Sequence, residues 1–211
     1  MISIDQMSFG YKRSETIIND LSWNFEQGAV TAVTGPSGRG KSTLLYLIGL
    51  LLTPWAGVIR RGETDLTRMS DLKRSRFRAE QVGFVFQDAA LDPTRTVLDN
   101  IVESHIYNNL RRREAVNRAE ALMEHFDVGL RADHKPGEVS GGQAQRIALC
   151  RALVSRPELV LADEPTGNLD PATASVVVEA FTEMAADEGK TVIVATHDPD
   201  VVAACDQVVE L

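Results

Sequence analysis

Gly35-Pro36-Ser37-Gly38-Arg39-Gly40-Lys41-Ser42 is the segment that most strongly indicates the fold class. It fits the pattern G-x-x-x-x-G-K-[ST] at every fixed position. Residues 29–33 before it are almost wholly apolar, which predicts a short strand buried on both faces. Residues 41–52 after it predict a helix that stops near Pro54. The glycine-rich loop is therefore expected between a buried strand and a helix, as in phosphate-binding loops.

The residue types of this loop suit a nucleotide phosphate. Glycines let successive backbone N–H groups point inward around an anion, and the N-terminus of the following helix adds partial positive charge. Lys41 can reach the β- and γ-phosphates, and the Ser42 hydroxyl can ligate Mg²⁺. We expect the whole loop and Thr43 to bind the nucleotide. The loop alone leaves kinases, GTPases and motor ATPases open.

Two adjacent carboxylates end another apolar strand, residues 159–162. Ligands of parallel sheets bind at the carboxyl edge of the strands, so Asp163 and Glu164 are expected near the phosphate-binding loop. Asp163 suits Mg²⁺, which prefers oxygen ligands and keeps several waters. Glu164 would lie beside an attacking water and accept its proton or orient it. The alternative, that the two acids only cap the strand and solvate a loop, is outweighed by the phosphate loop on a neighbouring strand.

The rest of the chain alternates strands with helices. Further strands are expected at residues 2–7, 17–25, 57–61, 82–86, 191–195 and 207–210, and further helices at 71–78, 141–154, 172–186 and after Pro199. Residues 96–110 and 113–126 have helical periodicity without an intervening strand. The pattern predicts an α/β fold: a P-loop NTPase (RecA-like) core with a mostly parallel sheet, an antiparallel β edge and an inserted α-helical subdomain.

Length and composition are those of one α/β domain with a well-buried core. The chain has 211 residues, of which 25% are charged and 44% hydrophobic, close to ordinary globular usage. Its formal net charge of -8 argues against a nucleic-acid partner, because DNA phosphates are bound by clustered Lys and Arg. The two cysteines lack a C-x-x-C spacing and suit a reducing cytoplasm. The longest apolar run, residues 44–52, is shorter than the roughly 20 residues of a membrane-spanning helix.

Ser140-Gly141-Gly142-Gln143 precedes a predicted helix rich in Ala, Leu and Ile. Ser140 and Gln143 fit the capping box S-x-x-[EQ]. Two glycines at a helix start also leave N–H groups open to an anion, and the Ser140 hydroxyl can donate to one. From these residues alone both readings stay open, and the ordinary capped helix is favoured.

The order of motifs along the chain resembles the ATP-binding-cassette family. Besides the Walker A loop and the Walker B strand that ends at Asp163-Glu164, the similar segments are a Q-loop, Phe86-Gln87; a signature, Val139-Ser140-Gly141-Gly142-Gln143; a D-loop, Asn168-Leu169-Asp170; and a switch, Thr196-His197-Asp198. Val139 stands where Leu is commoner in the family, a mild apolar change. The likeness covers nearly the whole chain, and the signature is specific to the family.

The resemblance implies roles for individual residues. Two domains would pack head to tail, with each ATP held by the Walker A loop of one copy and residues 140–143 of the other. Gln87 would contact Mg²⁺ or the attacking water, so Ser42, Gln87 and Asp163 would hold the metal. Glu164, His197 and Gln87 would act in catalysis, with His197 bonded to the γ-phosphate. Tyr11 would stack on adenine, and Asp170 would lie at the dimer contact. ATP and Mg²⁺ are the implied cofactors.

The resemblance also implies one nucleotide-binding domain over residues 1–211. Its catalytic core would comprise residues 1–87 and 150–211, and its helical subdomain, which includes the signature, residues 88–149.

Residues 162–170, ADEPTGNLD, look like the corresponding stretch of the lipoprotein-release, macrolide-export and cell-division branch. That likeness implies a cytoplasmic ATPase, peripheral on the inner face of a bacterial cell membrane, which dimerises and drives a separate transmembrane permease. One alternative is a regulator of cell-wall remodelling whose ATP cycle moves no substrate. Another is a stand-alone P-loop kinase.

Overall fold

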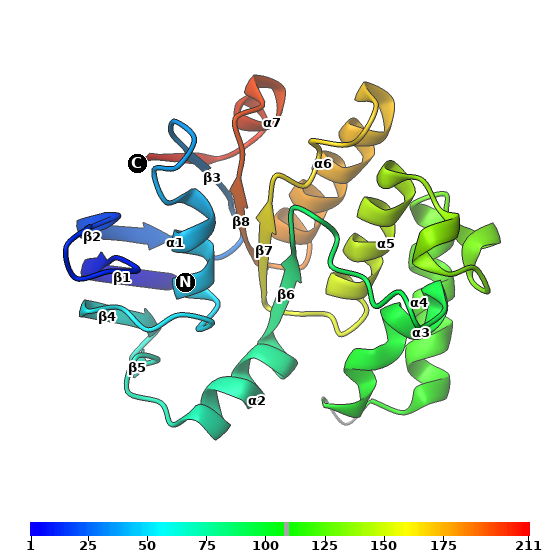
Figure 1. Cartoon of the computed structure of the whole chain (residues 1–211), viewed down its shortest axis with the longest axis horizontal. Coiled ribbons are helices and arrows are strands. Elements are labelled where there is room, and N and C mark those ends of the chain that lie inside the picture. Colours follow the sequence, from blue (N-terminus) through cyan, green and yellow to red (C-terminus); the bar gives the residue numbers. More distant parts are fainter. Residues whose placement is uncertain (108–109) are drawn as a thin grey trace.

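Two β-sheets form the frame of the molecule in the computed structural model, which describes residues 1–107 and 110–211 (Figure 1). The larger sheet is parallel, with the order β6 (Val82–Val85), β7 (Leu159–Asp163), β8 (Thr191–Ala195), β3 (Val30–Thr34) and β9 (Gln207–Glu210). The smaller sheet is antiparallel, with the order β2 (Ile18–Phe25), β1 (Ile2–Phe9), β4 (Ala56–Arg61) and β5 (Thr64–Asp65). The expected antiparallel strands thus form a sheet of their own, which lies beside the parallel one.

The helices fall into three groups (Figure 1). Helix α1 (Lys41–Ile48) lies between the two sheets, and α2 (Asp71–Gln81) leads into β6. A helical segment follows β6 and contains α3 (Val97–Val102), the 3-10 turn Glu103–Ile106, α4 (Arg112–His125), two further 3-10 turns at Gly129–Arg131 and Pro136–Glu138, and α5 (Gly141–Leu153). Helices α6 (Pro171–Ala186) and α7 (Pro199–Ala203) follow β7 and β8.

The parallel sheet is buried on both faces because the strands between its edges carry apolar residues at consecutive positions. In β7, Leu159 and Leu161 pack with α1 and the antiparallel sheet. The alternate residues Val160 and Ala162 pack into a second hydrophobic cluster, which also contains side chains of α3, α4, α5 and α6. The helical segment therefore shares a continuous hydrophobic core with one face of the sheet.

Two predicted helices differ from those observed. Helix α1 was predicted to reach residue 52 but ends at Ile48, since Gly49 caps it and Leu50 has a φ of 57°. Leu50 is nevertheless buried, so the apolar pattern continues past the end of the helix. The single helix predicted for residues 96–110 is instead α3 followed by a 3-10 turn that ends at Ile106. The part of this prediction that covers residues 108–109 lies outside the described residues.

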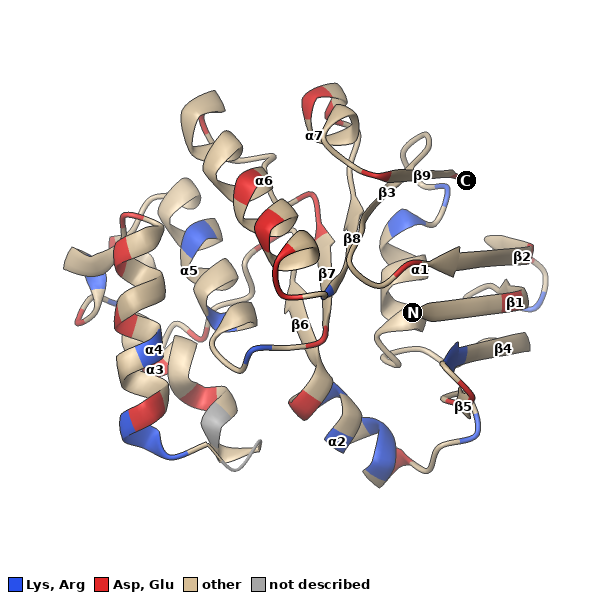
Figure 2. Cartoon of the chain, turned by 180° about the vertical axis from the view of Figure 1, so that it is seen from behind, with Lys and Arg blue, Asp and Glu red and all other residues tan. Residues whose placement is uncertain are grey.

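Charge is distributed unevenly over the helices. Figure 2 shows Lys and Arg concentrated on α2 and Asp and Glu along α6. Two arginines of α2 are engaged by the fold, because Arg74 donates to Thr67 O at 2.7 Å and Arg78 donates to Leu50 O at 2.9 Å. Within the described residues, no helix is both long and apolar enough to span a bilayer.

Candidate nucleotide-binding site

A cavity of about 530 Å³ lies where the phosphate loop meets the carboxyl ends of β7 and β8. It brings together residues from five separate parts of the sequence. The lining residues that the sequence predicted are Tyr11, Ser37, Gly38, Gly40, Lys41, Ser42, Thr43, Gln87, Asp163, Glu164 and His197. Ile17, Gly167 and Asn168 also line it and were not predicted to do so.

The loop between β3 and α1 has a conformation that its glycines permit. Gly35, Gly38 and Gly40 have φ values of 139°, 80° and 99°. L-residues with a Cβ rarely adopt such positive values, whereas glycine does so readily. A Cβ on Gly40 would also meet Ile17 Cγ2 at 2.6 Å. Lys41 Nζ donates to Gly35 O at 2.8 Å and Pro36 O at 3.4 Å. The ammonium group is thus held inside the loop, where phosphate oxygens would be bound.

Ser42 and Asp163 meet at the base of the cavity although they come from different elements. Asp163 ends β7, is only 2% exposed, and accepts a hydrogen bond from the Ser42 side chain. Burial raises the pKa of Asp163, and nearby Glu164 raises it further, whereas the Ser42 hydrogen bond and Lys41 lower it. A hydroxyl beside a buried carboxylate suits Mg²⁺, which takes a few protein oxygens and keeps its other waters.

Glu164 and His197 form a pair at the edge of the cavity. Glu164 has a φ of 47°, and its N–H donates to Ala195 O at 2.8 Å, so β8 fixes its backbone. Its Oε1 lies 2.8 Å from His197 Nδ1, with the Glu164 side chain 14% exposed and the His197 side chain 77% exposed. The hydrogen bond and charge of Glu164 raise the pKa of His197. A left-handed glutamate at a cavity edge is the kind of strained residue that functional sites retain.

Tyr11 and Gln87 lie on opposite sides of the phosphate loop in the sequence but line the same cavity. The Tyr11 hydroxyl lies 3.3 Å from Thr43 Oγ1, and its ring packs edge-on against Phe9 at 5.3 Å between centroids. The Tyr11 side chain stays exposed, as a stacking platform requires. Gln87 follows β6 by two residues and is also exposed.

Other predicted residues do not line this cavity. Gly35, Pro36 and Arg39 belong to the loop but lie outside the lining. The residues of the signature motif, Ser140, Gly141, Gly142 and Gln143, start α5 instead. There Gln143 N donates to Ser140 Oγ at 3.2 Å, and Ser140 N donates to Gln143 Oε1 at 2.9 Å, which completes the capping box. Asp170 likewise caps α6 by accepting from Thr173 N at 3.1 Å.

The three unpredicted lining residues carried different signals. Gly167 and Asn168 follow Glu164 closely in the sequence. Their position just after the acidic end of a strand is a signal from which they could have been predicted to line the cavity. Asn168 had been assigned only to the D-loop. Ile17 belongs to no motif, and its place follows from packing against Gly40.

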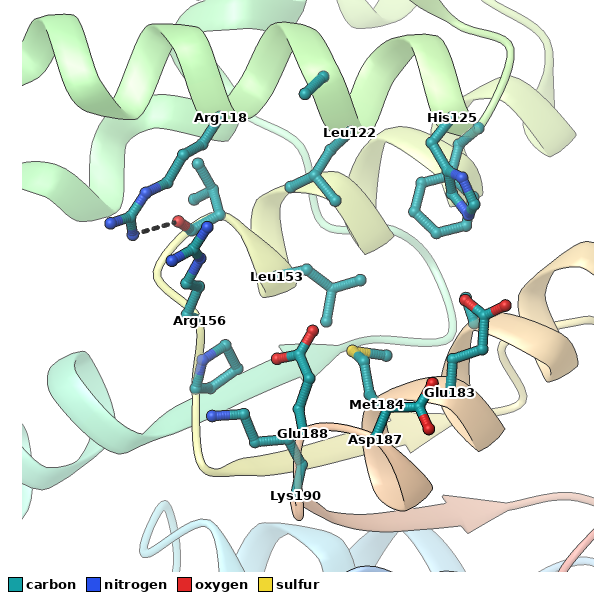
Figure 3. Close-up of a pocket in the computed structure, with 15 residues that line it drawn as sticks. Arg118, Leu122, His125, Leu153, Arg156, Glu183, Met184, Asp187, Glu188 and Lys190 are labelled. Carbon is teal, nitrogen blue, oxygen red and sulfur yellow. Dashed lines mark hydrogen bonds between the residues drawn. The ribbon is translucent and has the colours of Figure 1, made fainter.

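A second cavity, of about 420 Å³, lies between α4, the end of α5 and α6 (Figure 3). Its walls combine apolar side chains such as Leu122, Leu153 and Met184 with charged groups of both signs. Some of these charges are already satisfied, because Lys190 Nζ lies 2.8 Å from Glu158 Oε1 and Arg118 donates to Val154 O at 3.4 Å. The lining of this cavity, among the described residues, includes neither a glycine-rich loop nor paired carboxylates at a strand end, so the first cavity is the candidate site.

Comparisons with known proteins agree with this assignment. A family model described as ABC transporter matches residues 18–167. The lipoprotein-releasing system ATP-binding protein LolD 1 of Rhodospirillum rubrum is 40% identical, over 100% of this chain and 94% of that protein. The macrolide export ATP-binding/permease protein MacB of Rhodopirellula baltica is 40% identical, over 92% of this chain and 29% of that protein.

Solved structures extend the likeness to the whole fold. The dimeric structure of a bacterial ABC transporter cassette has a TM-score of 0.93 and 33% identity, with 100% of this chain and 94% of that chain covered. The same cassette in a dimeric post-hydrolysis state, bound to ADP and Pi, has a TM-score of 0.91 and 31% identity at the same coverage. The motif order, the gathered site residues and these likenesses together show that the chain belongs to the ABC transporter family, as one of its ATP-binding cassettes.

Proposed function

We propose that this chain binds and hydrolyses MgATP as the nucleotide-binding subunit of a bacterial membrane transport complex. Two copies would enclose two nucleotides and drive a separate permease subunit. The observation that carries the proposal is the single cavity in which Lys41, Ser42, Asp163, Glu164 and His197 converge. The relative bound to ADP and Pi supports hydrolysis as the reaction.

Each of these residues has a role in the proposed reaction. The loop N–H groups and Lys41 would bind the β- and γ-phosphates, and Ser42 and Asp163, with Gln87, would hold Mg²⁺. The bound metal would neutralise phosphate charge. Glu164 accepts a proton from the water that attacks the γ-phosphorus, and the bond from that phosphorus to the bridging oxygen of ADP breaks. His197 would orient Glu164 through their 2.8 Å contact and would hydrogen-bond the γ-phosphate.

A second copy of the chain completes the proposed site. Ser140 and Gly141 are exposed and lie outside the cavity of their own chain, so they are free to contact a nucleotide bound elsewhere. The solved dimers of the related cassette support this arrangement. ATP bound between two electropositive loops stabilises the closed dimer relative to the open dimer only through contacts that it makes in the closed dimer alone. The signature residues and Asp170 would supply these contacts, and loss of the γ-phosphate would weaken them.

The two parts of the domain would have different roles in this cycle. Residues 1–87 and 150–211 would form the catalytic core, and residues 88–149 the subdomain that responds to the nucleotide and docks the permease. A small cavity of about 180 Å³ in this subdomain is lined by Arg95, Val102 and Ile106 among others. Ile106 and Tyr107 are 62% and 64% exposed. Exposed apolar side chains beside a cavity suit a membrane-protein partner at the inner face of the cell membrane.

Substitutions of Lys41 and Glu164 test the proposed chemistry. Lys41→Ala should remove most of the affinity for MgATP, because the phosphates lose their cation. Glu164→Gln should keep that affinity but lower kcat by about two decades or more, because the water loses its base. It should also accumulate an ATP-bound dimer. Nucleotide binding, phosphate release and particle mass are the measurements; unchanged turnover in Glu164→Gln would remove this residue from catalysis.

Transport is distinguished from the alternatives by two further assays. Flux of a labelled substrate into vesicles that contain the cognate membrane subunit is expected to depend on ATP and on Glu164. ATP turnover without flux would favour a regulator of cell-wall remodelling. Transfer of the phosphoryl group to an acceptor other than water by the isolated chain would favour a kinase.

A further inference from the structure

Arg151 has an unusual place in the fold for an arginine. It lies in the last turn of α5 and is partly buried. Its guanidinium donates to two backbone oxygens, from Nη1 to Ala90 O at 2.6 Å and from Nη2 to Ala89 O at 2.7 Å. Burial lowers the pKa of Arg151, which indicates that the group has been withdrawn from water. These two carbonyls belong to the second and third residues after Gln87 in the chain.

The segment that Arg151 holds is conformationally unfavourable. Ala89 and Ala90 have φ values of 61° and 47°, and a non-glycine residue in the left-handed region is disfavoured by its Cβ. Local backbone bonds bend the segment, with Ala89 N donating to Phe86 O at 3.1 Å and Ala90 N to Asp88 O at 2.7 Å. Two consecutive left-handed alanines persist only where surrounding contacts impose them. The two hydrogen bonds of Arg151 are such contacts.

A second side chain of α5 fixes the other end of the same segment. Gln145 is 1% exposed, and its Nε2 donates to Phe86 O at 3.3 Å. Gln87 therefore lies between two points of attachment to α5, one at Phe86 and one at Ala89–Ala90. The same helix begins with the exposed Ser140.

We propose that Arg151 is a positioning residue that holds Ala89 and Ala90 left-handed and thereby aims Gln87 into the nucleotide cavity. A shift of α5, caused by a nucleotide at Ser140, would move the two attachment points and with them Gln87. The inference rests on the proposed function in one respect: Gln87 must act on the MgATP that the same cavity binds. It adds a residue outside the cavity to the machinery that sets the position of Gln87.

A double-mutant cycle on the full chain tests the proposal. Arg151→Ala should lower kcat for MgATP about tenfold or more, because a misplaced Gln87 no longer orients the reacting groups. The KM for MgATP should change less than about twofold, since the phosphate loop is untouched. In a Gln87→Ala background Arg151→Ala should cause little further loss, because the two residues act as one unit. Losses that multiply independently would overturn the proposal.

Arg146 supplies a matched control on the same helix. Its Nη1 donates to Phe126 O at 2.8 Å and Asp127 O at 3.3 Å, away from the Gln87 segment. Any effect of Arg146→Ala should therefore be the same with and without Gln87→Ala. If Arg146→Ala were coupled to Gln87 as strongly as Arg151→Ala, the lower kcat would come from removing any partly buried arginine of α5. Misplacement of Gln87 would then not be its cause.

A rescue experiment covers the case in which Arg151→Ala weakens the fold or Gln87→Ala leaves no measurable rate. Glycine adopts positive φ without strain, so Ala89→Gly with Ala90→Gly should restore much of kcat in the Arg151→Ala chain. Thermal melts show which variants are folded. A folded triple variant that is as slow as Arg151→Ala would contradict a conformational role. Failure of the proposed function itself would appear separately, as absence of Lys41-dependent hydrolysis in the wild type.

Discussion

At the scale of single residues, the contact between His197 and Glu164 links the site to pH. Glu164 raises the pKa of His197, so the native chain holds this proton more tightly than the unfolded chain. The stabilisation is complete below the ordinary value of 6.5 and is lost as pH rises through the raised pKa of the folded state. His197→Ala should therefore lower Tm more at about pH 6 than at about pH 9.

Thermal melts at the two pH values measure this difference, and Glu164→Gln is the control. Without the carboxylate the pH dependence of the His197→Ala effect should shrink. The same loss of Tm at both pH values would show that the contact does not depend on the histidine proton.

Asp163 is a residue whose function opposes stability. Burial is the main cause of the raised pKa of Asp163. Ionisation of this carboxyl at neutral pH therefore costs more free energy in the folded chain than in the unfolded chain. Asp163→Asn should therefore raise the Tm of the nucleotide-free chain. The same variant should lose Mg²⁺-dependent hydrolysis. Calorimetry measures the change in Tm, and phosphate release measures the loss of hydrolysis. A lower Tm would mean that the Ser42 hydrogen bond outweighs the cost of burying the charge.

Sequence reasoning is strongest for residues whose chemistry is tied to a fixed spacing. The lysine and serine of the phosphate loop and the two acids at the end of β7 are predicted at one cavity because the strand ends of a parallel sheet share an edge. Ile17 could not be predicted, since only the approach of the residue before β2 to Gly40 brings it there. Arg151 was missed for a related reason: its partners are backbone carbonyls, which carry no sequence signal.

At the scale of elements, the capping box of α5 contributes stability independently of any nucleotide. Ser140 and Gln143 exchange two hydrogen bonds at the start of this helix. Ser140→Ala should lower the free energy of unfolding by about 1 kcal/mol, which corresponds to roughly 2–4 °C in Tm for a chain of this size. Ser140→Thr keeps a hydroxyl acceptor and should retain most of the stability. Equal melting of all three proteins without nucleotide would show that the cap contributes nothing measurable.

Element boundaries were predicted less well than element types. The apolar periodicity of α1 runs on through Leu50, so the pattern does not mark the turn that ends the helix at Ile48. In α3 the change to a 3-10 turn after Val102 likewise leaves the spacing of apolar residues almost unaltered. The short strand β5 has only two residues, too few to show a period.

At the scale of the whole molecule, the two hydrophobic clusters explain how distant motifs act together. One cluster joins α1 to the antiparallel sheet, and the other joins the helical segment to the opposite face of the parallel sheet. The phosphate loop thus rests on one cluster and the signature helix on the other. The sequence predicted both parts, but not that the helical segment shares its core with the sheet, because long-range packing leaves no local pattern.

Each nucleotide is proposed to be held by two chains, and ATP-dependent cross-linking between the Walker A loop of one chain and the signature of the other tests this arrangement. In a Glu164→Gln, Cys205→Ser background, one protein would carry Arg39→Cys, at an exposed loop position outside the cavity lining. A second would carry Ser140→Cys. Cys150 is fully buried and stays in place. A short bismaleimide should join the two proteins into a dimer when they are mixed with MgATP, and much less with ADP or when either protein is alone. A cross-linking yield in the mixture that does not change with ATP would contradict the claim.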